Sequence, residues 1–279
     1  MLAAILGLMA GLVLGLTGAG GSVLAVPLLM WGMGWTLPQA APVALLAVCV
    51  SAALGTFTAC RQKIVRYRAA LVMAATGMIT APLGLKSAAL LPVNLLTGIF
   101  AVVLLLIAAR LWRQTRTQPE ETRIVRAALQ GVSINNTSPL CELNPDTGRL
   151  RWTRPCTVAI ISSGAATGFL AGLLGVGGGF VIVPALRQFT NLPFHSAVAT
   201  SLMAIALTSA GTAAIAVAGG HHLPWLIALP FMAGAIAGML AGRLLAPKMA
   251  GPRLQQGFAL LMLLVAAGMG LKAVGQLPF

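Results

Sequence analysis

The sequence predicts an all-α membrane protein that crosses the bilayer several times and consists of two similar halves. Hydrophobic residues make up 58% of the 279 residues and charged residues only 8%, whereas a soluble domain carries about 25% charged residues. Apolar runs of about 20 residues alternate with short polar breaks, which is typical of transmembrane helices. In addition, one glycine-rich stretch occurs twice in the chain.

The two copies of the glycine-rich stretch align without a gap. Residues 11–29 read GLVLGLTGAGGSVLAVPLL, and residues 168–186 read GFLAGLLGVGGGFVIVPAL. The alignment places Gly18, Gly20, Gly21, Ser22 and Pro27 opposite Gly175, Gly177, Gly178, Gly179 and Pro184. Because so many glycines and prolines coincide, we interpret the chain as a duplication.

The duplication divides the chain into a first membrane repeat (1–112), a connector (113–156) and a second membrane repeat (157–279). Each repeat is expected to begin with a long glycine-containing segment, 1–34 or 157–188. Three ordinary membrane segments follow, at 38–59, 69–91 and 93–112 in the first repeat and at 194–218, 223–247 and 253–275 in the second. The connector is expected to lie in the cytoplasm and to contain a β-hairpin around its Asn-Pro-Asp-Thr-Gly turn.

The basic residues predict that the two repeats are inverted relative to each other. Lys and Arg accumulate on the cytoplasmic side of membrane proteins, and both the loop RQKIVRYR (61–68) and the connector are basic. The corresponding loop of the second repeat, AGGHHLP (218–224), contains no Lys or Arg. This reversal is expected if each glycine-rich segment is broken and re-entrant, so that each repeat crosses the membrane three times. The positive-inside rule also explains the net charge of +14 without nucleic acid as a partner.

The glycine clusters are expected to bind an anion at the ends of broken helices. Non-helical backbone is tolerated at membrane depth only where protein or a water-filled cavity satisfies its polar groups. A helix that starts near Phe180 would direct its free N–H groups and its positive dipole end at the glycine turn. Glycine allows a ligand to approach those amides closely. The alternative is a kink that serves helix packing alone.

Hydroxyl groups near the clusters are expected to help hold an anion. Thr200, Ser201, Thr208 and Ser209 lie in one stretch of the second repeat, although such hydroxyls commonly bond to the backbone of their own helix. Pro27 and Pro184 are expected near the first turn of the second half-helix. The predicted substrate-binding residues are Gly18, Gly20, Gly21, Ser22, Gly175, Gly177, Gly178, Gly179, Thr200 and Ser201.

All acidic residues lie in the connector, namely Glu120, Glu121, Glu142 and Asp146. Their absence from the membrane segments excludes ion coupling through an intramembrane carboxylate and a carboxylate site for calcium or magnesium. It favours an anion pathway, and no metal or other cofactor is expected. Lys86 and Arg243 align with each other and are candidates for an anion entrance, or for cations that extend to the membrane surface.

Two of the four cysteines, Cys141 and Cys156, flank the predicted hairpin. Because the connector is placed in the cytoplasm, we do not expect a structural disulfide there. A reactive or regulatory pair and two small buried hydrophobic side chains remain as alternatives.

Both glycine clusters follow the pattern G-x-G-G-[GS] with a proline five residues later. This duplicated pattern resembles the sulfite exporter TauE/SafE family of membrane permeases, and the resemblance covers residues 1–112 and 157–279. It implies the transport of sulfur-containing anions, such as sulfite and sulfonates, across the bacterial inner membrane. Ser22 is a mild departure from the pattern in the first copy.

The expected function is therefore export of small sulfur-containing anions by alternating access at the broken helices. An inside-negative membrane potential favours the export of anions. Uptake of the same anions is one alternative, and a membrane sensor or accessory subunit that acts through the connector is another. An enzyme is not expected, because no acid–base pair, activated nucleophile or metal cluster is visible. The expected partners are the anion, the lipid bilayer and, as an open alternative, a second copy of the chain.

Overall fold

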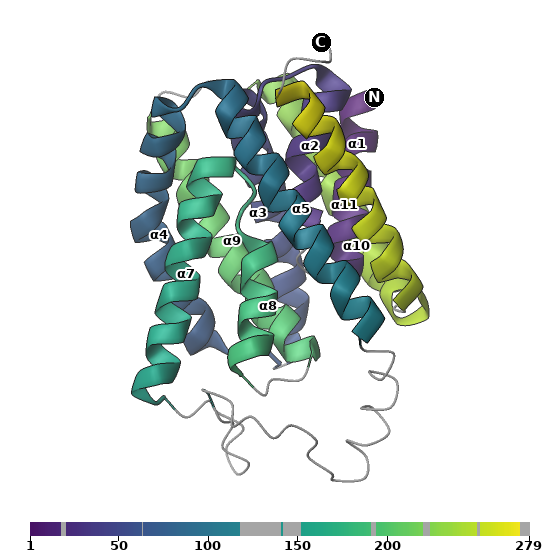
Figure 1. Ribbon diagram of the computed structural model, residues 1–279. Coiled ribbons are helices and arrows are strands. Elements are labelled where there is room, and N and C mark those ends of the chain that lie inside the picture. The colour runs from purple at the N-terminus through teal and green to yellow at the C-terminus, as the bar shows by residue number, and fades with distance from the viewer. Residues whose placement is uncertain are drawn as a thin grey trace.

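The computed structural model describes residues 1–17, 21–62, 64–117, 141, 152–190, 194–219, 224–249 and 252–273. The regular structure in these ranges is helical (Figure 1). The helices of the first half are α1 (Leu2–Thr17), α2 (Gly21–Met33), α3 (Leu37–Arg61), α4 (Tyr67–Leu90) and α5 (Val93–Thr117). Those of the second half are α7 (Arg154–Leu174), α8 (Gly179–Phe189), α9 (Phe194–Ala218), α10 (Trp225–Met249) and α11 (Pro252–Ala273).

The predicted fold class, an all-α membrane protein with broken glycine-rich helices, is confirmed. Five of the described helices are long and apolar enough to cross a membrane, namely α3, α4, α7, α9 and α10. Large apolar side chains also point away from the protein, as Ile79, Leu226 and Leu244 do with 74%, 92% and 77% of their surface exposed. Such side chains would be costly in water and are suited to lipid.

The strongest helix contacts join one half of the chain to the other. Helix α1 packs along α10, α4 along α7, α5 along α11 and α3 along α9. The helices of the two halves can be matched in order, so that α1 corresponds to α7 and α4 to α10. Under this matching, the α1–α10 pair corresponds to the α4–α7 pair. The α3–α9 and α5–α11 pairs each correspond to themselves. A duplicated chain with two-fold pseudosymmetry would give this reciprocal pattern.

Glycines set the close approach between these helices. A Cβ atom at Gly11 would collide with the carbonyl of Ala235 on α10, and one at Gly168 would collide with the carbonyl of Gly77 on α4. Their neighbours one turn away, at positions 7, 15, 164 and 172, show the same crowding. These small-x-x-x-small ladders therefore serve helix packing. Thr80 Oγ1 adds a hydrogen bond across the α4–α7 interface, to the Ala165 carbonyl at 2.8 Å.

Each broken helix pair turns back on itself. Along α2, a Cβ atom at Gly21 would meet Leu14, and one at Gly32 would meet Leu6, so α2 returns alongside α1 toward the N-terminus. Helices α7 and α8 form a corresponding hairpin, whose outer ends lie at the end of the bundle opposite the N and C termini (Figure 1). Both hairpins therefore bring their glycine turns into the interior of the bundle.

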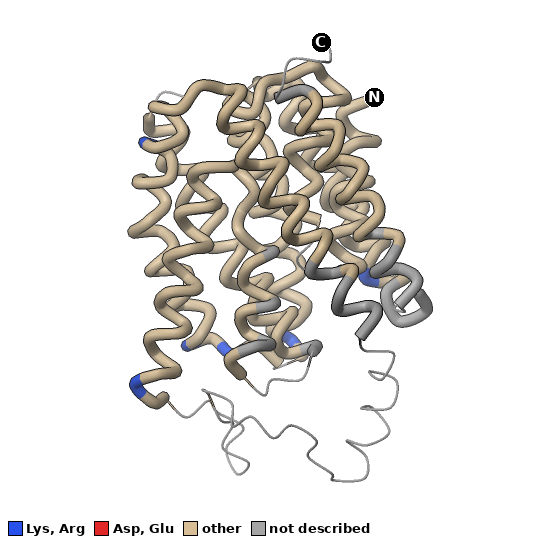
Figure 2. The backbone as a smooth tube through the Cα atoms, in the orientation of Figure 1, with Lys and Arg blue, Asp and Glu red and all other residues tan. Residues whose placement is uncertain are grey.

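Positive charge gathers at one end of the bundle. Figure 2 shows Lys and Arg mainly at the end opposite the labelled termini. This end holds the turn between α3 and α4, with Arg61, Arg66 and Arg68, and the beginning of α7, with Arg154. We call it the basic end. By the positive-inside rule it is the end expected in the cytoplasm.

Candidate functional site

The second glycine cluster breaks the helix as predicted. Helix α7 ends at Leu174 and α8 begins at Gly179. Between them, Gly175, Gly177 and Gly178 have φ angles of 71°, 68° and 65°. This left-handed region is strained for residues with a Cβ atom. The conformation of the turn itself therefore explains why several glycines stand almost side by side in an apolar segment.

Helix α8 starts without a side-chain cap. Its N-cap residue is Gly178, whose carbonyl accepts a hydrogen bond from the Val181 N–H at 3.1 Å. The first N–H groups of a helix have no partner within the helix, and they carry about half a positive charge as the end of the macrodipole. The turn thus presents hydrogen-bond donors and positive potential to the interior of the bundle.

The start of α2 meets the start of α8. Ser22, in the first turn of α2, is fully buried, and its Oγ lies 3.3 Å from the position of a Cβ atom on Gly179. Gly21 is also buried at the beginning of α2. Gly18 and Gly20 lie outside the described residues. Two positive helix ends, one from each half, therefore come together.

Two serines from the neighbouring helices complete this central region. A Cβ atom at Gly177 would lie 2.5 Å from Ser209 Oγ on α9 and 3.2 Å from Val48 Cγ1 on α3. Ser51, one turn after Val48, lines a small cavity together with Val48 and Gly21. We call the first turns of α2 and α8, the glycine turn 175–178, Ser51 and Ser209 the central site.

Thr200 and Ser201 lie away from the central site. Thr200 Oγ1 donates to the Ser196 carbonyl at 2.6 Å and accepts the Arg66 N–H at 3.1 Å. Ser201 Oγ donates to the Val198 carbonyl at 2.8 Å. Because Thr200 precedes Ser209 by nine residues on α9, the two are separated by about 13 Å along the helix axis. The structure thus favours the alternative in which these two hydroxyls bond to backbone.

Ser51 and Ser209 are not among the substrate-binding residues predicted from the sequence, although Ser209 was noted there as one of four hydroxyl residues. Both residues lie near the middle of 25-residue helices, α3 and α9. A hydroxyl at the midpoint of a long apolar helix was the signal that could have identified them, because the midpoint of a spanning helix lies at the depth of the broken turns.

The two motif prolines lie close to the first turns of α2 and α8. Pro27 is inside α2 and Pro184 is inside α8, each in the second turn. Each helix begins within its glycine cluster, at Gly21 or Gly179. A proline in the second turn has no N–H to donate and leaves the carbonyl four residues earlier without its usual partner.

The alignment of Lys86 with Arg243 is also corrected. A Cβ atom at Gly15 would lie 3.0 Å from the Arg243 nitrogen, and its counterpart at Gly172 would lie 3.0 Å from the Leu85 nitrogen. In the packed helices Arg243 therefore corresponds to Leu85, one residue before Lys86. One residue rotates a side chain by about 100° on a helix, so the two cations point in different directions.

The two cations accordingly have different environments. Arg243 is half-buried, and its Nη1 donates to the Gly55 carbonyl of α3 at 2.7 Å. Lys86 is exposed near the end of α4. Neither has a carboxylate available among the described residues, which contain no Asp or Glu.

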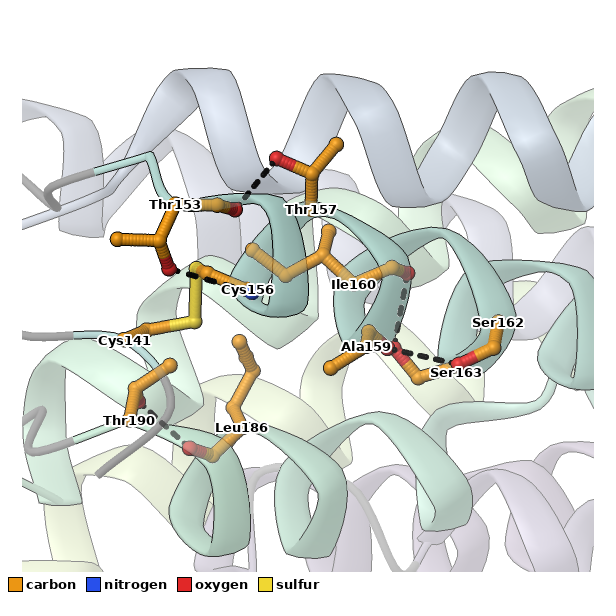
Figure 3. The surroundings of a disulfide bond; sticks show 10 residues. All are labelled: Cys141, Thr153, Cys156, Thr157, Ala159, Ile160, Ser162, Ser163, Leu186 and Thr190. Atoms are coloured by element: carbon orange, nitrogen blue, oxygen red, sulfur yellow. Dashed lines mark hydrogen bonds between the residues drawn. A yellow bond between two sulfur atoms is a disulfide. The ribbon is translucent and has the colours of Figure 1, made fainter. Parts of the chain in front are cut away.

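Cys141 and Cys156 form a disulfide, contrary to the expectation of no structural disulfide (Figure 3). The Cys141 N–H also donates to the Phe189 carbonyl at 2.9 Å, and Cys141 pairs with Thr190 in an isolated parallel bridge. Cys156 lies in the first turn of α7, where its N–H donates to Thr153 Oγ1 at 3.4 Å. This geometry joins the beginning of α7 to the end of α8 and brings the two sulfurs together. The predicted hairpin and the acidic residues lie outside the described residues.

No three His, Cys, Asp or Glu side chains in the described part of the chain are grouped so that they could hold a metal ion. The central site offers backbone amides, serine hydroxyls and apolar side chains instead. These groups are suited to binding and releasing an anion, since they donate hydrogen bonds and carry no full charge.

Comparison with known proteins identifies the family of the chain. The family model described as "Sulfite exporter TauE/SafE" matches residues 3–269. The chain belongs to this family. Two proteins of Xylella fastidiosa, both named "Probable membrane transporter protein", are similar to it. The Temecula1 protein is 30% identical over 263 residues, covering 92% of this chain and 89% of the relative. The 9a5c protein is 32% identical over 260 residues, covering 92% and 89%.

A third relative of this TauE/SafE chain is the "Probable membrane transporter protein YunE" of Bacillus subtilis. It is 29% identical over 254 residues, which cover 88% of each chain. No solved structure matches the chain. The family and the apolar helices together identify a multi-pass membrane transporter rather than an enzyme.

Proposed function

We propose that this TauE/SafE protein exports small sulfur-containing oxyanions, such as sulfite or sulfonates, across the bacterial inner membrane. The observation that carries the proposal is the meeting of α2 and α8 at the central site, with two positive helix ends and no carboxylate in the described residues. Helix N-termini bind anions through their free amides and their dipoles. A sulfite or sulfonate group has three oxygens around one sulfur, and each oxygen accepts hydrogen bonds.

The two halves act as inverted repeats in this proposal. The reciprocal contacts of α1 with α10 and of α4 with α7 support it, and so do the two hairpins that return to opposite ends of the bundle (Figure 1). Inverted-repeat transporters bind substrate between their repeats and alternate access by moving one repeat against the other. The described glycines and serines of the central site are buried, as an occluded intermediate of such a cycle requires.

Charge determines the favoured direction. Moving one negative charge outward through an inside-negative potential releases about 2.3 kcal/mol for each 100 mV. The membrane potential alone can therefore drive export, and no carboxylate in a membrane segment is available to couple uptake to protons or sodium. The description of the family as sulfite exporters supports the same direction and substrate.

Flux through proteoliposomes tests the proposal. Radiolabelled sulfite or methanesulfonate should leave vesicles loaded with the anion when the protein is present, faster when the interior is made negative. Uptake that is accelerated by a positive interior potential would be the same electrogenic process in reverse. No flux of either anion at either polarity would contradict the proposal.

Gly177→Ala locates the pathway. The new Cβ atom would overlap Ser209 Oγ, and the alanine would have to keep the backbone φ angle of 68°. We therefore expect the variant to insert into the membrane but to lose anion flux. Gly34→Ala is the matched control, because Gly34 has the same φ angle of 68° but no atom within 4 Å of its Cβ position. If both variants lose flux equally, backbone strain rather than the central site is responsible.

A further inference from the structure

Hydroxyl groups buried in the helices of this protein usually bond to the backbone one turn earlier. Thr167 Oγ1 donates to the Ser163 carbonyl at 2.6 Å, and Thr208 Oγ1 donates to the Ala204 carbonyl at 2.9 Å. The same arrangement satisfies the buried hydroxyls of Thr97, Ser163, Thr190, Thr200, Ser201 and Thr212. In an apolar interior this local bond removes the cost of an unpaired O–H group.

Ser51 and Ser209 are exceptions to this arrangement. Their exposed fractions are 1% and 0%, and their Oγ atoms have no hydrogen-bond partner within the described structure. Leaving a buried hydroxyl unsatisfied is unfavourable. Two unsatisfied hydroxyls in one region point to a ligand that accepts hydrogen bonds.

Both serines with unpaired hydroxyls lie beside the broken helices. Ser209 Oγ lies 2.5 Å from the Cβ position of Gly177, in the turn before α8. Ser51 lines the cavity that Gly21 lines at the beginning of α2. Val48 contacts both regions, since its Cγ1 lies 3.2 Å from the Gly177 Cβ position and it lines the same cavity as Ser51. The two hydroxyls therefore belong to one region, with one supplied by each half of the chain.

We infer that Ser51 and Ser209 are ligands for the oxygens of the transported anion and select a polyoxygen anion over a halide. The inference rests on the proposed function, because the anion must bind at the central site. Two hydroxyl donors on opposite helices, added to the amides of α2 and α8, match a pyramidal group with several separate oxygens. A halide is a single atom and can be held by the amides alone.

The test compares ligand binding by purified wild-type protein, Ser51→Ala and Ser209→Ala in detergent, with sulfite, methanesulfonate and bromide as separate probes. Because hydrogen bonds to charged groups are among the strongest in proteins, each substitution should raise the Kd of both oxyanions about tenfold. The Kd of bromide should stay within about twofold. The Tm of the ligand-free variants should be unchanged or higher, since an unsatisfied hydroxyl has been removed.

Matched controls separate the ligand role from a packing role. Thr208→Val removes the neighbouring hydroxyl of α9, which bonds to its own helix, and Thr56→Val does the same on α3, where Oγ1 donates to the Ala52 carbonyl at 2.8 Å. Neither should alter the Kd of an oxyanion. If Ser209→Ala does not fold, Ser209→Cys keeps the same number of side-chain atoms but offers only a weak donor, and it should show a similar loss.

The outcomes distinguish the inference from the proposed function. Unchanged oxyanion affinity in both serine variants, with normal wild-type flux, would overturn the inference and leave the transport proposal intact. An equal loss of affinity for bromide would also overturn it. A wild-type protein that neither binds nor moves an oxyanion would refute both. Weaker binding of sulfite but not of methanesulfonate would identify sulfite as the anion that the hydroxyls hold.

Discussion

Arg243 and Lys86 show that a shift of one residue along a helix changes the direction and the contacts of a side chain. Both are cations near the end of a long apolar helix, but Arg243 reaches into the bundle and donates to the Gly55 carbonyl at 2.7 Å. That carbonyl also accepts a hydrogen bond from Thr58 Oγ1 at 2.9 Å. Arg243 thus links α10 to α3, whereas Lys86 is exposed near the end of α4.

The two cations should respond differently to neutral substitution. We expect Arg243→Gln to lower the free energy of unfolding by about 1–3 kcal/mol, because it removes a charged donor from the carbonyl of the buried Gly55. Lys86→Gln should leave stability unchanged. If Lys86 attracts anions, this variant should lower kcat/KM about two- to threefold at low salt, and the effect should fade as the Debye length shortens.

Chemical denaturation and flux at two ionic strengths check both expectations. A loss of kcat/KM in Lys86→Gln that does not depend on salt would contradict an electrostatic entrance. Equal stability of Arg243→Gln and the wild type would contradict the linking role of Arg243.

At the scale of elements, the interfaces depend on glycine more than on large apolar side chains. Gly168 on α7 and Gly77 on α4 bring the two backbones so close that a Cβ atom on Gly168 would overlap the Gly77 carbonyl. Without a hydrophobic driving force in lipid, such close backbone packing and interhelical hydrogen bonds are what hold helices together. The Thr80–Ala165 bond lies in the same interface.

A methyl group on this interface should therefore separate the helices. We expect Gly168→Ala to destabilise the protein by about 1–3 kcal/mol or more through overpacking. The matched control is Gly270→Ala on α11, where nothing lies within 4 Å of the Cβ position and alanine is the better helix former. Thermal unfolding in detergent compares the two variants. Equal Tm values would show that the α4–α7 interface can accommodate an additional methyl group.

The helices were predictable from the sequence because apolar run length and glycine pattern act locally. The segment expected at 194–218 is α9 (Phe194–Ala218), and the break at the second cluster falls between Leu174 and Gly179. The one-residue shift between Lys86 and Arg243 was not predictable, since it is set by packing on α7 and α1. The orientations of Ser51 and Ser209 depend on neighbouring helices for the same reason. The disulfide also depends on tertiary structure, because the end of α8 brings Cys141 close to Cys156.

At the scale of the whole molecule, the two halves interlock around the central site. Each glycine hairpin belongs to one half and packs against helices of the other, as α1 does on α10. The proposed inversion then places the end of α4 and the beginning of α10 on the same side of the membrane. Eight simple crossings would instead place the beginnings of α4 and α10 on the same side.

Cysteine labelling in intact cells distinguishes these topologies. In a background without Cys49 and Cys60, we expect Leu90→Cys and Leu226→Cys to react with an impermeant thiol reagent from outside. Both positions are exposed, at 86% and 92%. Gln62→Cys, in the exposed turn at the basic end, should react only after permeabilisation. Labelling of positions 62 and 226 from the same side would refute the inverted arrangement.

The pairing of α1 with α10 also has a consequence for biosynthesis. Gly11 packs against Ala235, so α1, once it has left the ribosome, waits for a partner more than 200 residues later in the chain. At a synthesis rate of 5–20 residues per second, that interval is roughly 10–45 s. During it, the small-residue face of α1 is covered by lipid, by translocon or by a chaperone rather than by α10. The interface between α1 and α10 is thus among the last that the nascent chain can form.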